Sequence, residues 1–152
     1  MTAVFTLVSL GIRSVSLASN ELTASFLASE GIEYIRNVRD GNVLSRTLPV
    51  LSANRLSECE SFRCYVDVRN TIIENCNDGC PPLRFNREIG IYNHDTEDPG
   101  TNDDSIFTRQ ISLSKFPDGE ATKVRSIVSW RQFPGAPERF FVIETTLFDT
   151  TF

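Results

Sequence analysis

Four cysteines, clustered in one short segment, are the residues whose spacing most restricts their chemistry. The 152-residue chain has no other cysteine, and these four are Cys59, Cys64, Cys76 and Cys80. Such a cluster forms disulfides in an oxidising compartment, or it binds zinc as a tetrahedral set of thiolates. The C-x4-C and C-x3-C spacings are wider than a C-x2-C zinc knuckle, so we expect disulfides and keep zinc as the alternative.

An expected hairpin over residues 62–76 favours one disulfide pairing. If this hairpin turns near its centre, Cys64 lies opposite Cys76, and Cys59 lies opposite Cys80. These nested bridges would stabilise the hairpin by restricting the unfolded chain, by about 3 kcal/mol for a loop of roughly 15 residues. The alternative, Cys59 with Cys64 and Cys76 with Cys80, closes two much shorter loops and stays open, because four cysteines allow three pairings.

A polar segment that follows Asn93 carries acids that are candidate calcium ligands. Carboxylate oxygens are the ligands that calcium prefers, although the order of these residues matches no EF-hand. The segment also has the composition of an exposed loop, whose charges are usually only solvated. Calcium is therefore the weaker hypothesis, and no other cofactor is expected. The candidate ligands are Asp95, Glu97, Asp98, Asp103 and Asp104.

His94 and two helical glutamates are the residues that acid–base catalysis would need. His94 is the only histidine, and it lies in the acidic segment and not on a rigid element beside a nucleophile, so we expect it to be solvated. Glu30 and Glu33 share a predicted helix with Arg36 and Arg39, which favours surface ion pairs over paired catalytic carboxylates. The sequence therefore predicts a protein that is not an enzyme.

The overall composition is that of an acidic globular protein. Hydrophobic residues make up 40% and charged residues 23% of the chain, and the formal net charge is −5. Lys and Arg are scattered, so the basic patch that nucleic-acid binding requires is not present and no nucleic-acid partner is expected. The apolar run 3–12 contains Thr and Ser and ends at Arg13, which makes it shorter than the ~20 residues of a membrane span.

Residues 1–40 have the pattern of one long helix that ends at Gly41. No proline occurs between Thr2 and Arg39, and Gly41 can adopt the left-handed conformation of a C′ residue. The first half is rich in Ser, Thr and Ala and has no partner within the chain, so it should pack against other molecules. In the second half, apolar residues at helical spacing predict a stripe that packs on a sheet: Leu27, Tyr34, Ile35 and Val38.

Residues 41–152 have the pattern of a globular β-sheet head that includes the disulfide-bearing region 59–80. By alternation, Trp130 and about half of 140-FFVI-143 should face the core. Hairpin-length connections predict an antiparallel sheet, so the fold class is α+β, with the long N-terminal helix packed on the sheet. The expected strands are 62–68, 71–76, 83–86, 89–93, 106–114, 123–132 and 138–148.

Three phrases of the sequence are similar to the type IV pilin-like superfamily, specifically to minor pilins and pseudopilins. They are 27-LASEGIEYIRNVRD-40, 107-FTRQISL-113 and 124-VRSIVSW-130, and the similarity extends from about Ser16 to Leu147. In this family a basic leader is cleaved before an FTLIE-like start that carries a Glu. Here 5-FTLVS-9 lacks that Glu, and we expect most of the hydrophobic anchor and the leader to be missing from this sequence.

The resemblance implies a non-enzymatic structural subunit of a bacterial type IV filament system, such as a pilus, a competence pilus or a type II secretion pseudopilus. Its partners would be other pilin subunits, which it would contact through the N-terminal helix. The family is held in the inner membrane, with its head in the periplasm, before assembly, and in a cell-surface or extracellular filament afterwards. The alternative from the residues alone is an extracellular adhesive module that binds a ligand or calcium through its loops.

Overall fold

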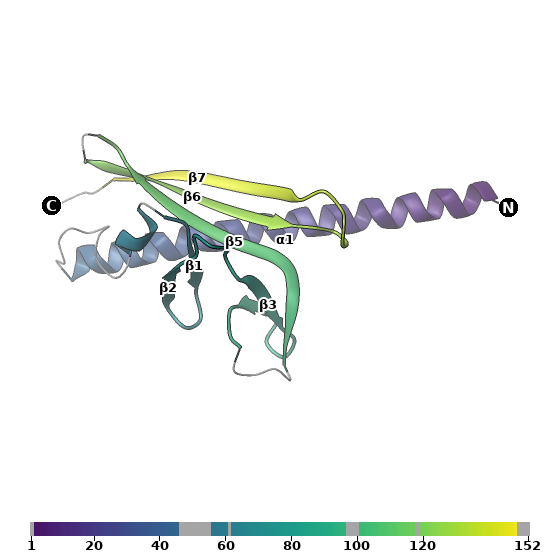
Figure 1. Ribbon diagram of the computed structural model, residues 1–152, viewed down its shortest axis with the longest axis horizontal. Helices are drawn as coiled ribbons and strands as arrows, with labels where there is room; N and C mark the ends of the chain where they lie inside the picture. Colours follow the sequence, from purple (N-terminus) through teal and green to yellow (C-terminus); the bar gives the residue numbers. More distant parts are fainter. Residues whose placement is uncertain (1, 46–55, 61, 97–100, 118, 149–152) are drawn as a thin grey trace.

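One long helix, α1 (Thr2–Leu44), packs against one antiparallel sheet of seven strands (Figure 1). The computed structural model describes residues 2–45, 56–60, 62–96, 101–117 and 119–148, without the side chains of residues 2–10 and 12. The C-terminal half of α1 lies along the sheet, whereas its N-terminal part projects beyond it (Figure 1). The predicted α+β class, with an N-terminal helix and an antiparallel sheet, is confirmed.

The longest strand, β5, organises the sheet. Residues 107–115 of β5 pair with β6, and β6 pairs with β7. The opposite edge of β5 is shared by two hairpins, because β1–β2 joins it at Ile111 and β3–β4 joins it over residues 102–108. The elements are the 3-10 helix η1 (Leu56–Cys59) and the strands β1 (Cys64–Asp67), β2 (Ile72–Asn75), β3 (Pro82–Asn86), β4 (Ile91–Asn93), β5 (Asn102–Lys115), β6 (Ala121–Trp130) and β7 (Arg139–Phe148).

The start of β5 corrects one prediction. Residues 102–104 were expected to belong to an exposed loop, but they pair with residues 84–86 of β3. An ion pair between Arg84 and Asp104, at 2.9 Å, joins the two strands across this pairing. Polar cross-strand pairs stabilise a ladder without the apolar alternation by which a strand is recognised in a sequence.

The core lies between one face of α1 and the inner face of the sheet. Leu27 and Ile35 are buried, and Tyr34 and Val38 are partly buried against the same core. Trp130 is buried as expected. The sheet contributes two neighbouring clusters, one around Ile111, Leu113, Val124 and Leu147 and one around Leu83, Phe107, Val128 and Trp130.

Helix α1 continues past Gly41, which was predicted to end it. Gly41 lies inside the helix, and the last turn closes at Ser45, whose backbone N–H and hydroxyl both donate to the Gly41 carbonyl. Asn42, one residue further, is buried. The final turn is therefore held by its contact with the head, and this contact outweighs the local tendency of glycine to stop a helix.

Gly31 marks the closest approach of α1 to the sheet. A Cβ atom at this position would lie 2.9 Å from Ser126 Oγ and 3.0 Å from Ile111 Cδ1. The backbone of α1 therefore rests directly on the side chains of β5 and β6. Only a residue without a side chain permits this distance.

We expect Gly31→Val to destabilise the protein, because the added methyl groups would push the helix away from the sheet. Overpacking of this kind typically costs about 1–3 kcal/mol. Gly41→Val is the matched control, since Gly41 lies in the same helix and, among the described residues, no atom outside its own helical turn lies within 4 Å of its would-be Cβ. Urea unfolding should show a lower midpoint for the first variant only, and equal midpoints for both variants would contradict the close packing.

Candidate interaction surfaces

The outward face of α1 carries an apolar stripe without a partner among the described residues. Val15, Leu22 and Phe26 are 71%, 58% and 66% exposed. Their spacing of seven and four residues places them on one side of the helix. The buried Ala24 and Ala28 lie on the other side, against the sheet. The stripe therefore faces away from the head.

Small hydroxyl residues surround this stripe, and their polar groups are satisfied within the helix. Thr23 Oγ1 donates to the Ser19 carbonyl at 3.0 Å, and Ser29 Oγ donates to the Ser25 carbonyl at 2.9 Å. Such bonds to the preceding turn remove the need for an outside partner. The surface of this part of α1 is consequently smooth and only weakly polar, which suits close packing against another helix or an apolar surface.

The loop between β6 and β7 contacts the N-terminal half of α1, which we call the stem (residues 2–26). Arg139, at the start of β7, pairs with Glu21 at 3.0 Å, and Gln132 Nε2 lies 3.5 Å from Ser16 Oγ. On its other side this loop borders a surface pocket of about 400 Å³, lined in part by Ile106 and Phe133. Phe133 is largely exposed there.

The candidate calcium ligands do not gather in the part of the chain that the structure describes. Asp104 pairs with Arg84, and Asp103 pairs with Arg87. As neighbours in β5, the two aspartates point to opposite faces of the strand. Within the described residues no group of three or more possible ligands comes together. Asp95 belongs to no such group either. Glu97 and Asp98 lie outside the described residues, so calcium binding stays a prediction.

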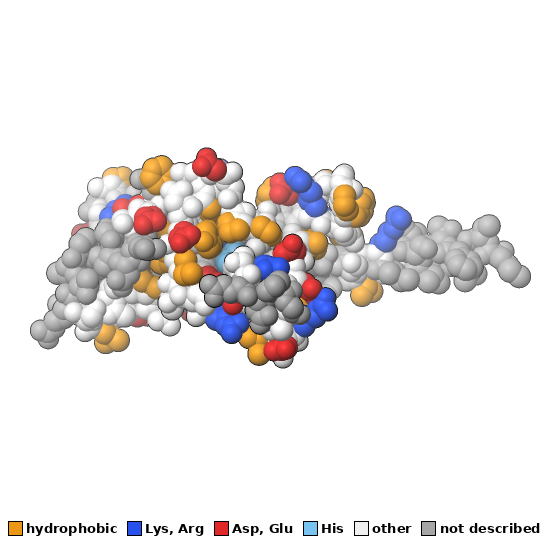
Figure 2. Space-filling model, turned by 60° about the horizontal axis from the view of Figure 1, so that its bottom comes forward, with side chains coloured by type: hydrophobic (Ala, Val, Ile, Leu, Met, Phe, Trp, Pro, Cys, Tyr) orange, Lys and Arg blue, Asp and Glu red, His pale blue; other side chains and the backbone are white. Residues whose placement is uncertain are grey.

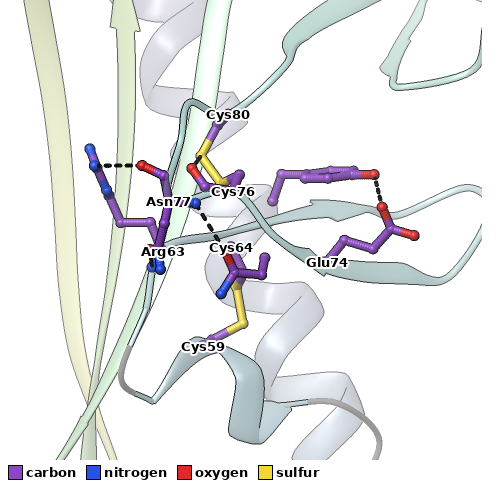
Figure 3. The surroundings of a disulfide bond; sticks show 9 residues. Cys59, Arg63, Cys64, Glu74, Cys76, Asn77 and Cys80 are labelled. Atoms are coloured by element: carbon purple, nitrogen blue, oxygen red, sulfur yellow. Dashed lines mark hydrogen bonds between the residues drawn. A yellow bond between two sulfur atoms is a disulfide. The ribbon is translucent and has the colours of Figure 1, made fainter.

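The cysteines pair locally, as Cys59–Cys64 and Cys76–Cys80, and the nested pairing that we favoured is wrong (Figure 3). The hairpin register explains this result. Cys64 lies opposite Asn75, and the Cys76 N–H donates to the Arg63 carbonyl, one position out of the expected register. A one-residue shift places Cys64 and Cys76 on opposite faces of the hairpin, where no bond can join them.

With all four thiols in disulfides, no thiolate is left for the zinc alternative. Arg63 precedes Cys64 and Asn77 follows Cys76, and these two residues join the strands next to the bridges: the Arg63 backbone N–H donates to Asn77 Oδ1, and the Arg63 guanidinium donates to the Asn77 carbonyl (Figure 3). Disulfides persist in oxidising compartments, so the protein is located outside the cytosol, in an extracellular or periplasmic space.

Tryptic digestion without reduction should distinguish the two pairings directly. Cleavage after Arg55, Arg63, Arg69 and Arg84 places Cys59 and Cys64 on separate peptides and leaves Cys76 with Cys80 on one. Local pairing gives one linked pair, 56–63 with 64–69, and a single peptide 70–84 that gains two hydrogens on reduction. Nested pairing would instead join all three peptides, which mass spectrometry would detect at once.

Arg109 is a buried charged residue that joins the helix to the sheet, and it was not singled out from the sequence. It lies on the inner face of β5 and is 1% exposed. Its guanidinium donates to the Leu27 carbonyl of α1 at 3.1 Å and to the Val66 carbonyl of β1 at 2.9 Å. It also pairs with the Glu30 carboxylate at 2.5 Å. Alternation along β5 placed residue 109 inward, beside Phe107 and Ile111, and was the available signal.

Glu30 consequently has a different partner from the one expected. We predicted surface ion pairs for Glu30 and Glu33 with Arg36 and Arg39. Glu33 does pair with Arg36, at 2.6 Å, whereas Glu30 turns toward the buried Arg109. A buried guanidinium attracts a carboxylate more strongly than a solvated one does, because water screens it less.

We expect Arg109→Met to destabilise the protein strongly. Methionine fills a similar volume, but the Leu27 and Val66 carbonyls and the Glu30 carboxylate would lose their donor. Leaving a buried acceptor without its donor costs about 1–3 kcal/mol, and the Leu27 and Val66 carbonyls would both be left so. Arg125→Met, on the solvent face of β6, should leave the midpoint of urea unfolding nearly unchanged because its pair with Glu144 is solvated. Similar losses for both variants would contradict the role of Arg109.

His94 is packed into the head, and the prediction that it is solvated is wrong. Its ring contacts the Tyr65 ring, with centroids 4.7 Å apart, and neither ring nitrogen makes a hydrogen bond of standard geometry to the part of the chain that the structure describes. Burial lowers the pKa of His94 from 6.5 to about 4, assisted by the positive charge of Arg109 and opposed by Asp67 and the Pro82 carbonyl. The only histidine lies among apolar side chains with acidic and basic side chains nearby (Figure 2).

No protein-family model matches this chain, and neither a curated protein nor a solved structure matches it at a significant level. Among the described residues, no helix combines the length and the hydropathy that crossing a membrane requires.

Proposed function

We propose that this protein is a structural subunit of a bacterial type IV pilin-like filament, a minor pilin or a pseudopilin, and that its role is not catalytic. The observation that carries this proposal is the outward face of α1, whose apolar stripe of Val15, Leu22 and Phe26 faces away from the sheet. The N-terminal part of the same helix projects beyond the sheet (Figure 1). An exposed apolar stripe on a long helix favours packing against further helices. Its partners would be other subunits of the same kind.

The residues that carry the family resemblance support this proposal by their positions. The phrase 27–40 supplies the inward face of α1, and the phrase 107–113 supplies the part of β5 that this face contacts. The two phrases meet through the pair of Glu30 with Arg109 and through Gly31 against Ile111. The residues of these two phrases therefore lie together in space, where the helix contacts the sheet.

The proposal assigns the protein two successive locations. Before assembly, subunits of this kind are held at the inner membrane with the head in the periplasm. After assembly they belong to a filament at the cell surface or outside the cell. The disulfides of the head fit both the periplasm and the exterior.

Self-association of the purified chain tests the proposal. Wild-type protein should form oligomers with increasing concentration in sedimentation velocity, and the double variant Leu22→Ser/Phe26→Ser should sediment as a monomer with an unchanged melting temperature. The matched control, Phe140→Ser/Val142→Ser, removes two exposed apolar residues from the outer face of β7 and should still associate. A wild type that stays monomeric, or a control that loses association equally, would contradict the role of the stem.

A second candidate is an extracellular adhesive module. The pocket beside the β6–β7 loop, with Ile106 and Phe133 at its surface, favours this reading because it offers a concave, partly apolar site on the head. The two functions use different surfaces. If the substitutions in α1 leave self-association unchanged, the adhesive module that uses the pocket becomes the favoured function.

A further inference from the structure

The pocket beside the β6–β7 loop opens on the face of the sheet that α1 does not cover. Thr108 of β5 and Ser129 of β6 line it, and they lie directly opposite each other in the ladder. Their neighbours Phe107 and Val128 are buried in the core against α1. Because successive side chains of a strand point to opposite faces, Thr108 and Ser129 point away from the helix, and the pocket lies on the outer face of the sheet.

The pocket is partly apolar, and its charges are paired within it. Ile106 and Phe133 line it and are 45% and 61% exposed. Arg131 and Glu138 are the charged residues of its lining, and they pair with each other at 3.7 Å. A volume of about 400 Å³ accommodates a few side chains. The pocket therefore suits an uncharged, apolar projection from another molecule.

The apolar stripe of α1 lies at the same level as the pocket, on the opposite face of the molecule. Gln132, which lines the pocket, donates to Ser16 of α1 at 3.5 Å, and Arg139 pairs with Glu21. Leu22 directly follows Glu21 but points away from the sheet. The helix and the sheet therefore separate the stripe from the pocket of the same copy, so the two surfaces cannot contact each other within one chain.

We propose that the stripe of one copy docks in the pocket of the next copy, with Leu22 and Phe26 as the side chains that enter it. This inference rests on the proposed function and names the surface that the stem contacts. The charges beside both surfaces are paired, because Glu21 next to the stripe pairs with Arg139 and the two charges of the pocket pair with each other. In a chain of formal net charge −5, two copies meet with least repulsion at such surfaces.

A contact between stripe and pocket is heterologous, because it joins two different surfaces. Two copies joined in this way leave one pocket and one stripe free at opposite ends, so further copies can add in an open series, as a filament requires. A stripe that packed symmetrically on the stripe of a second copy would instead use both stripes and stop at a dimer. The two arrangements therefore differ in which variants can assemble.

Sedimentation velocity of two complementary variants tests the proposal. Leu22→Ser/Phe26→Ser (the stripe variant) disrupts the stripe, and Ile106→Thr/Phe133→Ser (the pocket variant) removes the exposed apolar side chains of the pocket. Each variant alone should be monomeric at concentrations where the wild type forms oligomers, with an unchanged melting temperature. Their equimolar mixture should form dimers and nothing larger, because only the pocket of the first variant and the stripe of the second remain to join.

The outcomes separate this inference from the proposed function. A pocket variant that associates like the wild type, while the stripe variant does not, would overturn the docking in the pocket and leave assembly through α1 standing. A mixture that stays monomeric would also overturn the docking. A wild type that stays monomeric would contradict the proposed function, and this inference with it. The control Phe140→Ser/Val142→Ser leaves the pocket lining intact and should associate like the wild type.

Photocrosslinking keeps the test decisive if the pocket variant does not fold. The variant Phe26→benzoylphenylalanine, in a mixture of unlabelled and isotope-labelled chains, reports contacts between copies. Trypsin releases position 26 in peptide 14–36, Ile106 in peptide 88–109 and Phe133 in peptide 132–139. We expect cross-links from peptide 14–36 to peptide 88–109 or 132–139 of another copy. Cross-links that join peptide 14–36 only to the same peptide of another copy, or no cross-link between associated copies, would overturn the proposal.

Discussion

The architecture depends on the contact between Gly31 of α1 and the buried Arg109 of β5. The missing side chain at Gly31 lets the helix backbone approach Ile111 and Ser126, and this approach brings the Leu27 carbonyl and Glu30 within reach of the guanidinium. Burying a guanidinium is unfavourable unless its donors find acceptors, and here two elements supply three of them: the Leu27 carbonyl and the Glu30 carboxylate of α1, and the Val66 carbonyl of β1. The same group therefore fixes how α1, β1 and β5 are placed relative to one another.

Because of this contact, α1 has one face that packs on the sheet and an opposite face that is exposed. Ala24, Leu27, Ala28 and Ile35 face the sheet and complete its core, so the head folds around the C-terminal half of α1. The opposite face is free of that requirement, and it still carries Leu22 and Phe26. Apolar residues on both sides of a helix are costly in water unless the second side also finds a partner, which is the physical basis for proposing assembly.

In the cysteine segment, the disulfides close short loops, whereas other contacts attach the segment to the sheet. Each disulfide closes a loop of a few residues, so the bridges shape η1 and the turn after β2 but do not connect the hairpin to the rest of the sheet. The hairpin is connected by its buried side chains Cys64, Val66 and Ile73, which belong to the core cluster around Ile111. Hydrogen bonds from Arg109 to the Val66 carbonyl and from the His94 N–H to Asp67 add to this connection.

The sequence by itself determined the α+β class, the long helix and the approximate positions of all the strands, because helical and alternating periodicities are local properties of the chain. It also placed Leu27 and Ile35 on the helix face that meets the sheet. Only the tertiary structure decided the disulfide pairing, the extension of β5 to Asn102, the burial of His94 and the pairing of Glu30 with Arg109. These features depend on a one-residue register or on partners 79 residues apart, which no local pattern in the sequence records.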